Sequence, residues 1–312
     1  MKTVILGAGG FMGRSIAKAL SVTNVDLTLF DMRFTEEQRD HFRCVKGDFS
    51  SPADLEPVLK EGVDTVIHLI STTVPATADK YPAADVRGNL LNTLELLDLC
   101  VRENVRRVIF VSSGGTVYGP LDRAAKEDYP CCPVCSYGIV KRTIEEYLGL
   151  YYRLKGLEYL ILRVGNAYGA AQTGKKPQGV IGAFLHRIVK GKPIEIWGDG
   201  SVVRDFIHID DVARSFVPAL QYTGSEHVFN VGTGQGYSVK HVVELIESTI
   251  GQSVALSYHP QNSLDIPMNV LDITRIWHET GWKPTISLGE GISQVYREIS
   301  DDVSDSAIRD CR

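Results

Sequence analysis

Short, strongly apolar runs alternate with longer amphipathic runs through the first half of this chain. The short runs occupy residues 3–6, 25–30, 42–45, 65–69, 108–111 and 159–164. They are apolar at nearly every position, which is typical of parallel strands that are buried on both faces. Helical periodicity fills the intervals at residues 12–20, 53–59, 85–104 and 137–155. This alternation predicts an α/β fold with a doubly wound parallel sheet.

The alternation changes after Val164, where Gly, Lys, Pro and Gln become frequent. The later patterns predict helices at 180–189, 211–222 and 239–250, a strand at 228–231 and a hairpin around the GDGS of 198–201. We expect a larger domain over 1–165, with returning segments near 205–236. A smaller, interleaved α/β lobe would comprise 166–204 and 237–300, and the polar residues 301–312 would form a flexible tail.

The composition is that of a globular protein with a full core, because 44% of the 312 residues are hydrophobic and 23% are charged. The net charge is −5 and no basic stripe stands out, so nucleic acid is not an expected partner. No run approaches the roughly 18 apolar residues of a membrane span, and the first apolar run is too short for a signal peptide. We therefore expect a cytoplasmic protein that binds no membrane and keeps its six cysteines reduced.

A glycine motif lies between the first predicted strand and the first predicted helix. Residues 7–13 read GAGGFMG, and such glycines let the backbone turn tightly and approach a pyrophosphate at the helix N-terminus. Asp31 closes the second predicted strand, where a carboxylate binds an adenosine ribose and repels a 2′-phosphate. The motif predicts a dinucleotide site that favours NAD over NADP, although Arg33 and Arg14 would suit a phosphate. Asp48, in the turn after the third strand, fits either the adenine or a solvated turn.

A tyrosine and a lysine four residues apart share one face of the helix that follows the fifth strand. They are Tyr137 and Lys141. An ammonium beside a phenol favours the phenolate, so we expect the pKa of Tyr137 to be lowered. A phenolate at neutral pH would be a base able to remove a hydroxyl proton.

Small hydroxyl residues follow the fifth strand in the sequence VSSGGTVYG of 111–119. Ser112, Ser113 and Thr116 are candidates to place an oxygen beside a substrate, or to bond to the backbone. The CxxC of Cys132 and Cys135 lies just before Tyr137. A zinc site needs about four ligands and no second Cys/His pair is near in the sequence, so we expect packing residues and no metal.

Four motifs occur together in one order. They are GAGGFMG at 7–13, SSGGTVYG at 112–119, SYGIVK at 136–141 and WGDGSVVRDFIHIDDV at 197–212. Over roughly residues 1–295 the chain resembles the extended short-chain dehydrogenase/reductase family, and most of all its NAD-dependent nucleotide-sugar epimerases. The resemblance implies a Rossmann-type fold, tightly held NAD, a nucleotide-diphosphate sugar as substrate and inversion of C4 through a transient 4-keto sugar.

The resemblance also assigns roles to residues. Tyr137 would be the base, Lys141 would hold the nicotinamide ribose, and a hydroxyl would assist at the sugar. Gly114 stands at the family's Ser/Thr position, so Thr116 is the first candidate for that hydroxyl and Ser113 the second. The implied cofactor contacts are, besides Tyr137 and Lys141, Gly7, Gly10, Phe11, Met12, Gly13, Asp31, Arg33, Asp48, Phe49, Leu69, Ser71, Asn89 and Ser112.

A further set of residues would contact the substrate. The implied contacts are Thr73, Thr116, Asn166, Gly179, Val180, Ile196, Arg204, Asp265 and Asn269. Arg204 matches an arginine that binds the diphosphate, whereas Asn262 stands where the family has a second one. Asn166 would contact the diphosphate or cap a turn. Asn269 is smaller than the tyrosine of glucose-restricted members, so we expect N-acetylated sugars to be accepted.

Two helices carry more apolar residues than one buried face requires, namely those predicted at 85–104 and 137–155. Their excess predicts a homodimer interface or, alternatively, burial under the second lobe. Three alternative functions remain open. A reductase of the same fold would consume its cofactor stoichiometrically, and a dehydratase would carry an Asp-Glu pair where Gly115 and Thr116 stand. A non-catalytic NAD-binding sensor would tend to lack the tyrosine or the lysine, and both are present.

Overall fold

A seven-stranded parallel sheet forms the centre of the molecule in a computed structural model that describes residues 1–170, 179–260 and 266–310. The strand order is β11-β6-β5-β4-β1-β2-β3, and every pairing is parallel. The strands are β1 (Lys2–Leu6), β2 (Asp26–Asp31), β3 (Arg43–Lys46), β4 (Thr65–His68), β5 (Arg107–Ser113), β6 (Glu158–Val164) and β11 (Val228–Val231). The predicted α/β, Rossmann-type doubly wound fold is confirmed.

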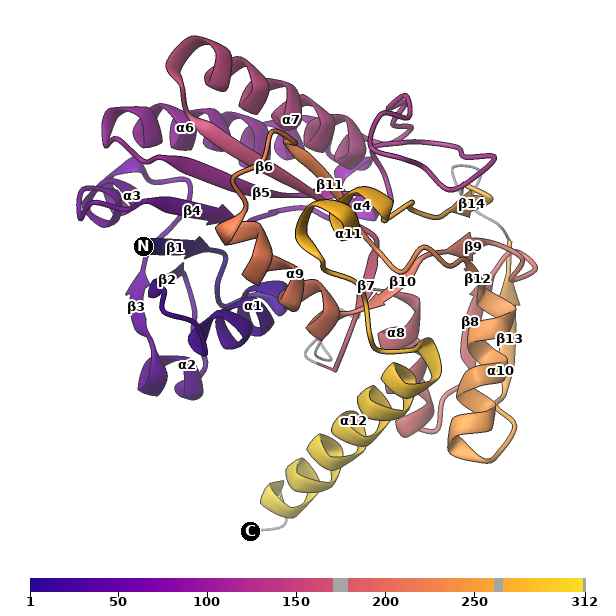
Figure 1. The fold of residues 1–312 in the computed structure, drawn as a ribbon. Coiled ribbons are helices and arrows are strands. Elements are labelled where there is room, and N and C mark those ends of the chain that lie inside the picture. Colours follow the sequence, from indigo (N-terminus) through magenta and orange to yellow (C-terminus); the bar gives the residue numbers. More distant parts are fainter. Residues whose placement is uncertain (171–178, 261–265, 311–312) are drawn as a thin grey trace.

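Helices cover both faces of this sheet (Figure 1). On one face lie α1 (Phe11–Ser21), α9 (Ile209–Gln221) and α11 (Thr274–Thr280), whose buried residues form one core with Ile5 and Ile67 of the strands. On the other face lie α3 (Pro52–Leu59), α6 (Asn92–Arg102) and α7 (Ser136–Lys155), which form a second core with Val4 and Val66. Because successive strand residues point to opposite faces, a continuous apolar strand serves both cores.

The second half of the chain builds a smaller lobe with its own core. Three helices surround that core, namely α8 (Val180–Val189), α10 (Val239–Ile250) and α12 (Leu288–Asp310). Its short strands are β8 (Ile194–Trp197) with β13 (Leu256–His259), and β9 (Val203–Arg204) with β12 (Tyr237–Ser238) and β14 (Met268–Asn269). Between the lobes, β7 (Asn166–Tyr168) pairs with β10 (Phe206–His208).

The hairpin expected around 198–201 is wrong. The strands on either side of the turn join different sheets, because β8 pairs with β13 whereas β9 pairs with β12 and β14. Asp199 explains the turn itself, since its Oδ1 accepts hydrogen bonds from the backbone N–H (2.9 Å) and the hydroxyl (2.6 Å) of Ser201. A turn signal marks where the chain bends, and does not by itself pair the flanking strands.

Other boundaries also differ from the predictions. The single helix expected over 85–104 is three pieces, α5 (Pro82–Asp85), the π-helix η1 (Val86–Leu91) and α6. Residues 301–310 of the expected tail continue helix α12, as Figure 1 shows at its yellow end, and the flexibility of the tail stays a prediction. Four helices of the described part of the chain were not predicted, α2 (Glu36–His41), α4 (Pro75–Ala78), α11 and α12. The capping box of Thr35 and Gln38 at the start of α2 was a readable signal for the first of them.

Candidate active site

The glycine loop between β1 and α1 leaves no room for side chains. Gly7 has a φ of +86°, and a Cβ on Gly13 would lie 2.3 Å from the carbonyl oxygen of Gly7. Helix α1 begins after Gly10 with no side-chain cap and no acidic residue in its first turn. Its first N–H groups and the positive end of its dipole are therefore available to an anion. This cradle fits the pyrophosphate of a dinucleotide.

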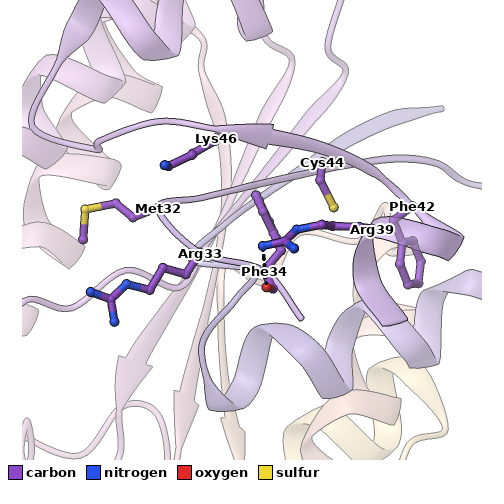
Figure 2. Close-up of a pocket in the computed structure, with 7 residues that line it drawn as sticks. All are labelled: Met32, Arg33, Phe34, Arg39, Phe42, Cys44 and Lys46. Atoms are coloured by element: carbon purple, nitrogen blue, oxygen red, sulfur yellow. Dashed lines mark hydrogen bonds between the residues drawn. The ribbon is translucent and has the colours of Figure 1, made fainter. Parts of the chain in front are cut away.

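Asp31 lies at the carboxyl end of β2 beside this loop. Its Oδ2 accepts a hydrogen bond from the N–H of Gly9 (3.0 Å), and its Oδ1 accepts one from the N–H of Arg33 (3.2 Å). Beyond it a hollow of about 560 Å³ is lined by cations and apolar groups (Figure 2). The lining residues are Met32, Arg33, Phe34, Arg39, Phe42, Cys44 and Lys46. The backbone N–H groups of Gly9 and Arg33 thus fix the Asp31 carboxylate beside the glycine loop, with cationic side chains lining the adjacent hollow.

The two residues expected near the adenine, Asp48 and Phe49, lie in different surroundings. Asp48 is exposed and accepts hydrogen bonds from the N–H and the hydroxyl of Ser50, both at 2.8 Å. These bonds hold the pKa of its carboxyl below the usual value. Phe49 is buried, and its ring centroid lies 5.0 Å from that of His68. Phe49 is therefore a core residue, whereas Asp48 caps its own turn and faces solvent.

A cavity of about 410 Å³ opens at the carboxyl ends of the central strands. It is lined by the glycine loop, the segment after β4, the end of β5, the first turn of α7 and the end of β6. The expected site residues that it brings together are Gly7, Gly10, Phe11, Met12, Gly13, Leu69, Ser71, Thr73, Ser112, Ser113, Thr116, Tyr137, Lys141 and Asn166. Ligands of open parallel sheets bind at this edge.

Tyr137 and Lys141 face this cavity from the first turns of α7. The Nζ of Lys141 lies 5.7 Å from the centroid of the Tyr137 ring and 4.5 Å from that of Phe110. It donates a hydrogen bond to the carbonyl oxygen of Val111 (2.9 Å). That bond fixes the ammonium against β5, at the floor of the cavity.

The electrostatics of this pair differ from the expectation. Burial raises the pKa of Tyr137 to about 12, and the Ser71 hydroxyl opposes that rise. Lys141 is not among the groups that lower it, so the expected lowering of the phenol pKa by the ammonium is wrong for the protein alone. Burial lowers the pKa of Lys141 to about 8, against the opposing charges of Glu145 and Asp85. Burial therefore disfavours the charged form of both groups, and at neutral pH a pKa of about 12 leaves the phenol protonated while a pKa of about 8 leaves Lys141 mainly an ammonium.

The hydroxyls at the end of β5 are not equivalent. Ser112 is buried and donates to Oε1 of Glu145 (2.5 Å), so its hydroxyl has a structural partner. The Oγ1 of Thr116 is buried and has no hydrogen-bond partner among the described residues. A Cβ on Gly114 would meet the Leu271 methyl groups at 2.6 and 2.9 Å. The packing of Leu271 thus explains the glycine at this position and leaves Thr116 as the first candidate, with Ser113 beside it.

A buried ion pair under the cavity was missed by the sequence reasoning. Arg163 of β6 and Glu145 of α7 form two bonds, Nη2 to Oε2 at 2.7 Å and Nε to Oε1 at 3.1 Å. Arg163 also donates to the Tyr118 hydroxyl (2.9 Å), which donates to Oδ1 of Asn230 (2.7 Å). The available signal was a charged residue within each of two apolar elements, since such residues are rarely buried unpaired.

Several expected contacts lie elsewhere. Ile196 is buried in the core of the small lobe, and Gly179 and Val180 start α8. Arg204 lies on β9 and donates through Nη1 to the carbonyl oxygens of Val203 (2.9 Å) and Ile266 (2.7 Å). Asp265, like Asn262, lies outside the described residues.

Two expected ligand contacts are buried in the structure. Asn269 is 0% exposed, and its Nδ2 donates to the carbonyl oxygen of Gly114 (3.0 Å). It therefore does not line the cavity, and the structure gives no support to its expected contact with a sugar substituent. Asn89, on η1, bonds to Asp85 and Thr73 within the protein.

The cysteines before Tyr137 have a structural explanation. Cys135 caps α7, because its Sγ accepts a hydrogen bond from the N–H of Gly138 (3.4 Å). The carbonyl of Cys132 packs against Gly119, where a Cβ would lie 2.0 Å from that oxygen. Among the described residues no group of three or more His, Cys, Asp and Glu side chains could hold a metal ion. None of the helices in the described part of the chain has the length and apolar character of a bilayer span.

Known proteins resemble the chain along nearly its whole length. The model of the NAD dependent epimerase/dehydratase family matches residues 3–232. The UDP-glucose 4-epimerase of Mycolicibacterium smegmatis is 32% identical over 304 residues, which are 94% of this chain and 97% of that protein. The dTDP-4-dehydro-6-deoxyglucose reductase of Escherichia coli is 30% identical over 305 residues, covering 95% of this chain and 96% of the reductase.

A solved structure agrees with the same assignment. The UDP-glucose 4-epimerase of Thermotoga maritima, determined with UDP-glucose, superposes with a TM-score of 0.92 at 28% identity. The match covers 97% of this chain and 100% of that one. The glycine cradle, the Tyr137–Lys141 pair and these likenesses agree, and the chain belongs to the NAD dependent epimerase/dehydratase family, with NAD as its cofactor.

Proposed function

We propose that the protein is an NAD-dependent nucleotide-sugar 4-epimerase that interconverts UDP-hexoses, either UDP-glucose with UDP-galactose or their N-acetylated counterparts. The observation that carries the proposal is that the glycine loop and the Tyr137–Lys141 pair line the same cavity. A cofactor on the loop and a sugar at the tyrosine would be in contact there. The two relatives named above support the substrate class, since both act on nucleotide sugars by their names.

Tyr137 would take the proton of the sugar 4-hydroxyl at its phenol oxygen and return it after the sugar has turned over. When bound, NAD supplies the redox chemistry, in which a hydride leaves C4 of the sugar and later returns to it. The protein supplies positioning and charge for both transfers. Lys141 holds a positive charge at the cavity floor, where its bond to Val111 fixes it.

A hydroxyl beside the phenol would pass or orient the same proton. Thr116 is the preferred group, because its Oγ1 is buried in the wall without a partner among the described residues. Such an orphaned donor is costly unless a ligand completes it. Ser113 lines the same wall and is the second candidate.

The proposal is tested by incubating the purified protein with each UDP-hexose without added NAD and following the products by proton NMR. A C4 epimer that forms from UDP-glucose or UDP-N-acetylglucosamine, and is lost in Tyr137→Phe, is the expected result. It would also show that NAD is retained through purification. No epimer from either sugar, with NAD supplied, would contradict the assignment.

A reductase is the second candidate function, and the 30% identity to a dTDP-4-dehydro-6-deoxyglucose reductase favours it. Gly114 also removes the hydroxyl that the epimerases of the resemblance carry at that position. The two functions differ in cofactor balance, because a reductase oxidises one equivalent of added NADH for each 4-keto sugar. Stoichiometric loss of NADH absorbance at 340 nm with a 4-keto substrate, without epimerisation, would assign the reductase.

We also propose that the protein is a homodimer. Five large hydrophobic side chains of η1 and α7 remain exposed in the single chain, Val86 (36%), Leu91 (47%), Ile139 (51%), Tyr152 (38%) and Leu154 (67%). The second lobe does not cover them, which supports the dimer over the alternative of burial under that lobe. A second copy packed against η1 and α7 would bury part of this apolar surface. Light scattering at micromolar concentration should give twice the chain mass, and a monomer mass would contradict the dimer.

A further inference from the structure

A buried carboxylate lies behind the cavity, bonded to the lining residue Thr73, and has no role in the proposed chemistry. Asp85, the last residue of α5, is 0% exposed. It accepts side-chain hydrogen bonds from Thr73 Oγ1 (2.7 Å), Asn89 Nδ2 (2.8 Å) and Ser136 Oγ (2.8 Å). Within the described residues it forms no ion pair. Burying a carboxylate without a cation is unfavourable, so its three donors must hold the charge in place.

These donors come from three different segments. Thr73 belongs to the segment after β4, and its carbonyl oxygen accepts a bond from the hydroxyl of Ser71 (2.9 Å). Ser136 is the residue immediately before Tyr137 on α7. Asp85 therefore connects the backbone that carries Ser71 to the helix turn that carries the phenol. Both Ser71 and Tyr137 line the cavity.

The third segment is the π-helix η1, which packs closely on the same loop. Asn89 accepts a bond from the N–H of Thr72 through Oδ1 (2.8 Å) while its Nδ2 donates to Asp85. A Cβ on Gly88 would lie 2.6 Å from Thr72 Oγ1, so glycine allows this approach. Single π-turns inside helices occur often at functional sites. Here the wide turn of η1 brings Asp85 and Asn89 to the same loop.

The charge of Asp85 also acts on both groups of the proposed chemistry. It raises the pKa of Tyr137 and the pKa of Lys141. The other groups around the phenol are Cys135, which raises its pKa, and Ser71, which lowers it. Around the ammonium, Glu145 raises its pKa, and the ammonium in turn lowers that of the buried His68. Asp79 accepts a bond from the N–H of Ser136 (2.7 Å) but is exposed.

We propose that Asp85 is a positioning residue that holds the Ser71 loop and the first turn of α7 together, so that the Ser71 hydroxyl stays within hydrogen-bonding reach of the Tyr137 phenol in the cavity. The proposal rests on the proposed function only for the role of Tyr137. Asp85 touches neither cofactor nor sugar in this account, and acts through Ser136 and Thr73.

The test replaces Asp85 by asparagine, which keeps the shape of the side chain and removes its charge and one acceptor oxygen. We expect the turnover number to fall about tenfold or more, because a misplaced base loses orientation. We also expect both limbs of the pH–rate profile to move to lower pH, since a lost negative charge favours phenolate and disfavours ammonium. A structural defect elsewhere would lower the rate without moving the limbs together.

Asp79→Asn is the matched control, because it makes the same chemical change at the same helix end. Asp79 is exposed, so its variant should keep the wild-type limbs of the profile. Limbs in Asp85→Asn that coincide with those of the wild type would overturn the proposal. Where Asp85→Asn fails to fold, Ser136→Ala removes one donor and keeps the charge. It should lower the turnover number with the limbs unmoved, and unchanged turnover would overturn the proposal.

A second readout needs no substrate. The ionisation of Tyr137 is followed at 295 nm as the difference between each protein and its Tyr137→Phe counterpart. The midpoint should lie at lower pH in Asp85→Asn than in the wild type, and an equal midpoint would overturn the proposal. If the wild type converts no UDP-hexose, the proposed function fails while this titration still decides the role of Asp85.

Discussion

The two ends of the cavity are built in different ways. The cofactor end is made of backbone, since the glycine loop and the uncapped start of α1 offer N–H groups and space. The chemical end is made of side chains, namely the half-buried Tyr137, the buried Lys141 and the buried Glu145–Arg163 pair below them. At the first end an added carbon atom is the sensitive change. At the chemical end, the sensitive change is the loss of an oxygen atom or of a charge.

This difference follows from what each end must do. A pyrophosphate carries its own charge, so backbone dipoles and room for close approach are enough to bind it. Proton transfer requires a side chain whose ionisation the surroundings determine. Burial raises the pKa of the phenol to about 12 and lowers that of the ammonium to about 8. The chemical end therefore depends on residues from distant parts of the chain.

The largest effect is expected from removing one oxygen atom at the chemical end. Tyr137→Phe should lower the turnover number by about 10³-fold, because the phenol oxygen is the proposed proton acceptor. The NAD content after purification, measured by absorbance of the released nucleotide, should equal that of the wild type. Activity within tenfold of the wild type would mean that another group takes the proton.

A charge lost below the cavity should cost stability. Glu145→Gln leaves the Arg163 guanidinium, which is 2% exposed, without its carboxylate partner. We expect the free energy of unfolding in urea to fall by about 3–5 kcal/mol, as for other broken buried pairs. Glu146→Gln is the matched control, since its carboxylate pairs with Arg142 but is 61% exposed. It should change stability by less than about 1 kcal/mol, and equal losses in both variants would contradict the distinction.

The sequence predicted the cofactor end better than the chemical end. Its glycines, strand and helix are adjacent along the chain, so spacing alone placed them. The chemical end combines residues 33 and 18 positions apart, in the bonds of Glu145 to Ser112 and to Arg163. No local pattern records such pairings. Asn269 shows the same limit, because only the path of β14 places its amide against the carbonyl of Gly114.

The elements of the fold also divide into those that local sequence patterns predicted and those that tertiary packing determines. The boundaries of α8, β11 and α10 agree with the apolar periodicity, which depends on near neighbours. The π-helix η1 could not be predicted, because its packing on the loop after β4 rather than its own pattern widens the turn. The GDGS hairpin failed for a related reason, since strand partners are chosen by tertiary packing.

One added carbon atom at the cofactor end should act on binding rather than on proton transfer. In Gly13→Ala the new Cβ would lie 2.3 Å from the Gly7 carbonyl oxygen, so the loop must shift. We expect NAD affinity, measured by calorimetry on protein stripped of nucleotide, to fall about tenfold or more. Gly289→Ala adds the same carbon where nothing lies within 4 Å, and should bind NAD as the wild type does. Unchanged affinity in Gly13→Ala would remove the loop from the cofactor site.

The smallest effect is expected at the start of α7, where the loss of the Cys135 cap should lower stability slightly. The thiol of Cys135 caps α7 through the N–H of Gly138 at 3.4 Å. Cys135→Ala removes the cap and should lower the free energy of unfolding by about 1 kcal/mol, whereas Cys135→Ser supplies a stronger capping oxygen and should restore or exceed the wild-type value. Both variants keep Tyr137 and Lys141, so retained turnover in Cys135→Ser would identify the cysteine as a cap. Turnover lost in Cys135→Ser, with stability intact, would instead assign the thiol to the chemistry, since a hydroxyl satisfies the helix but does not reproduce a thiolate.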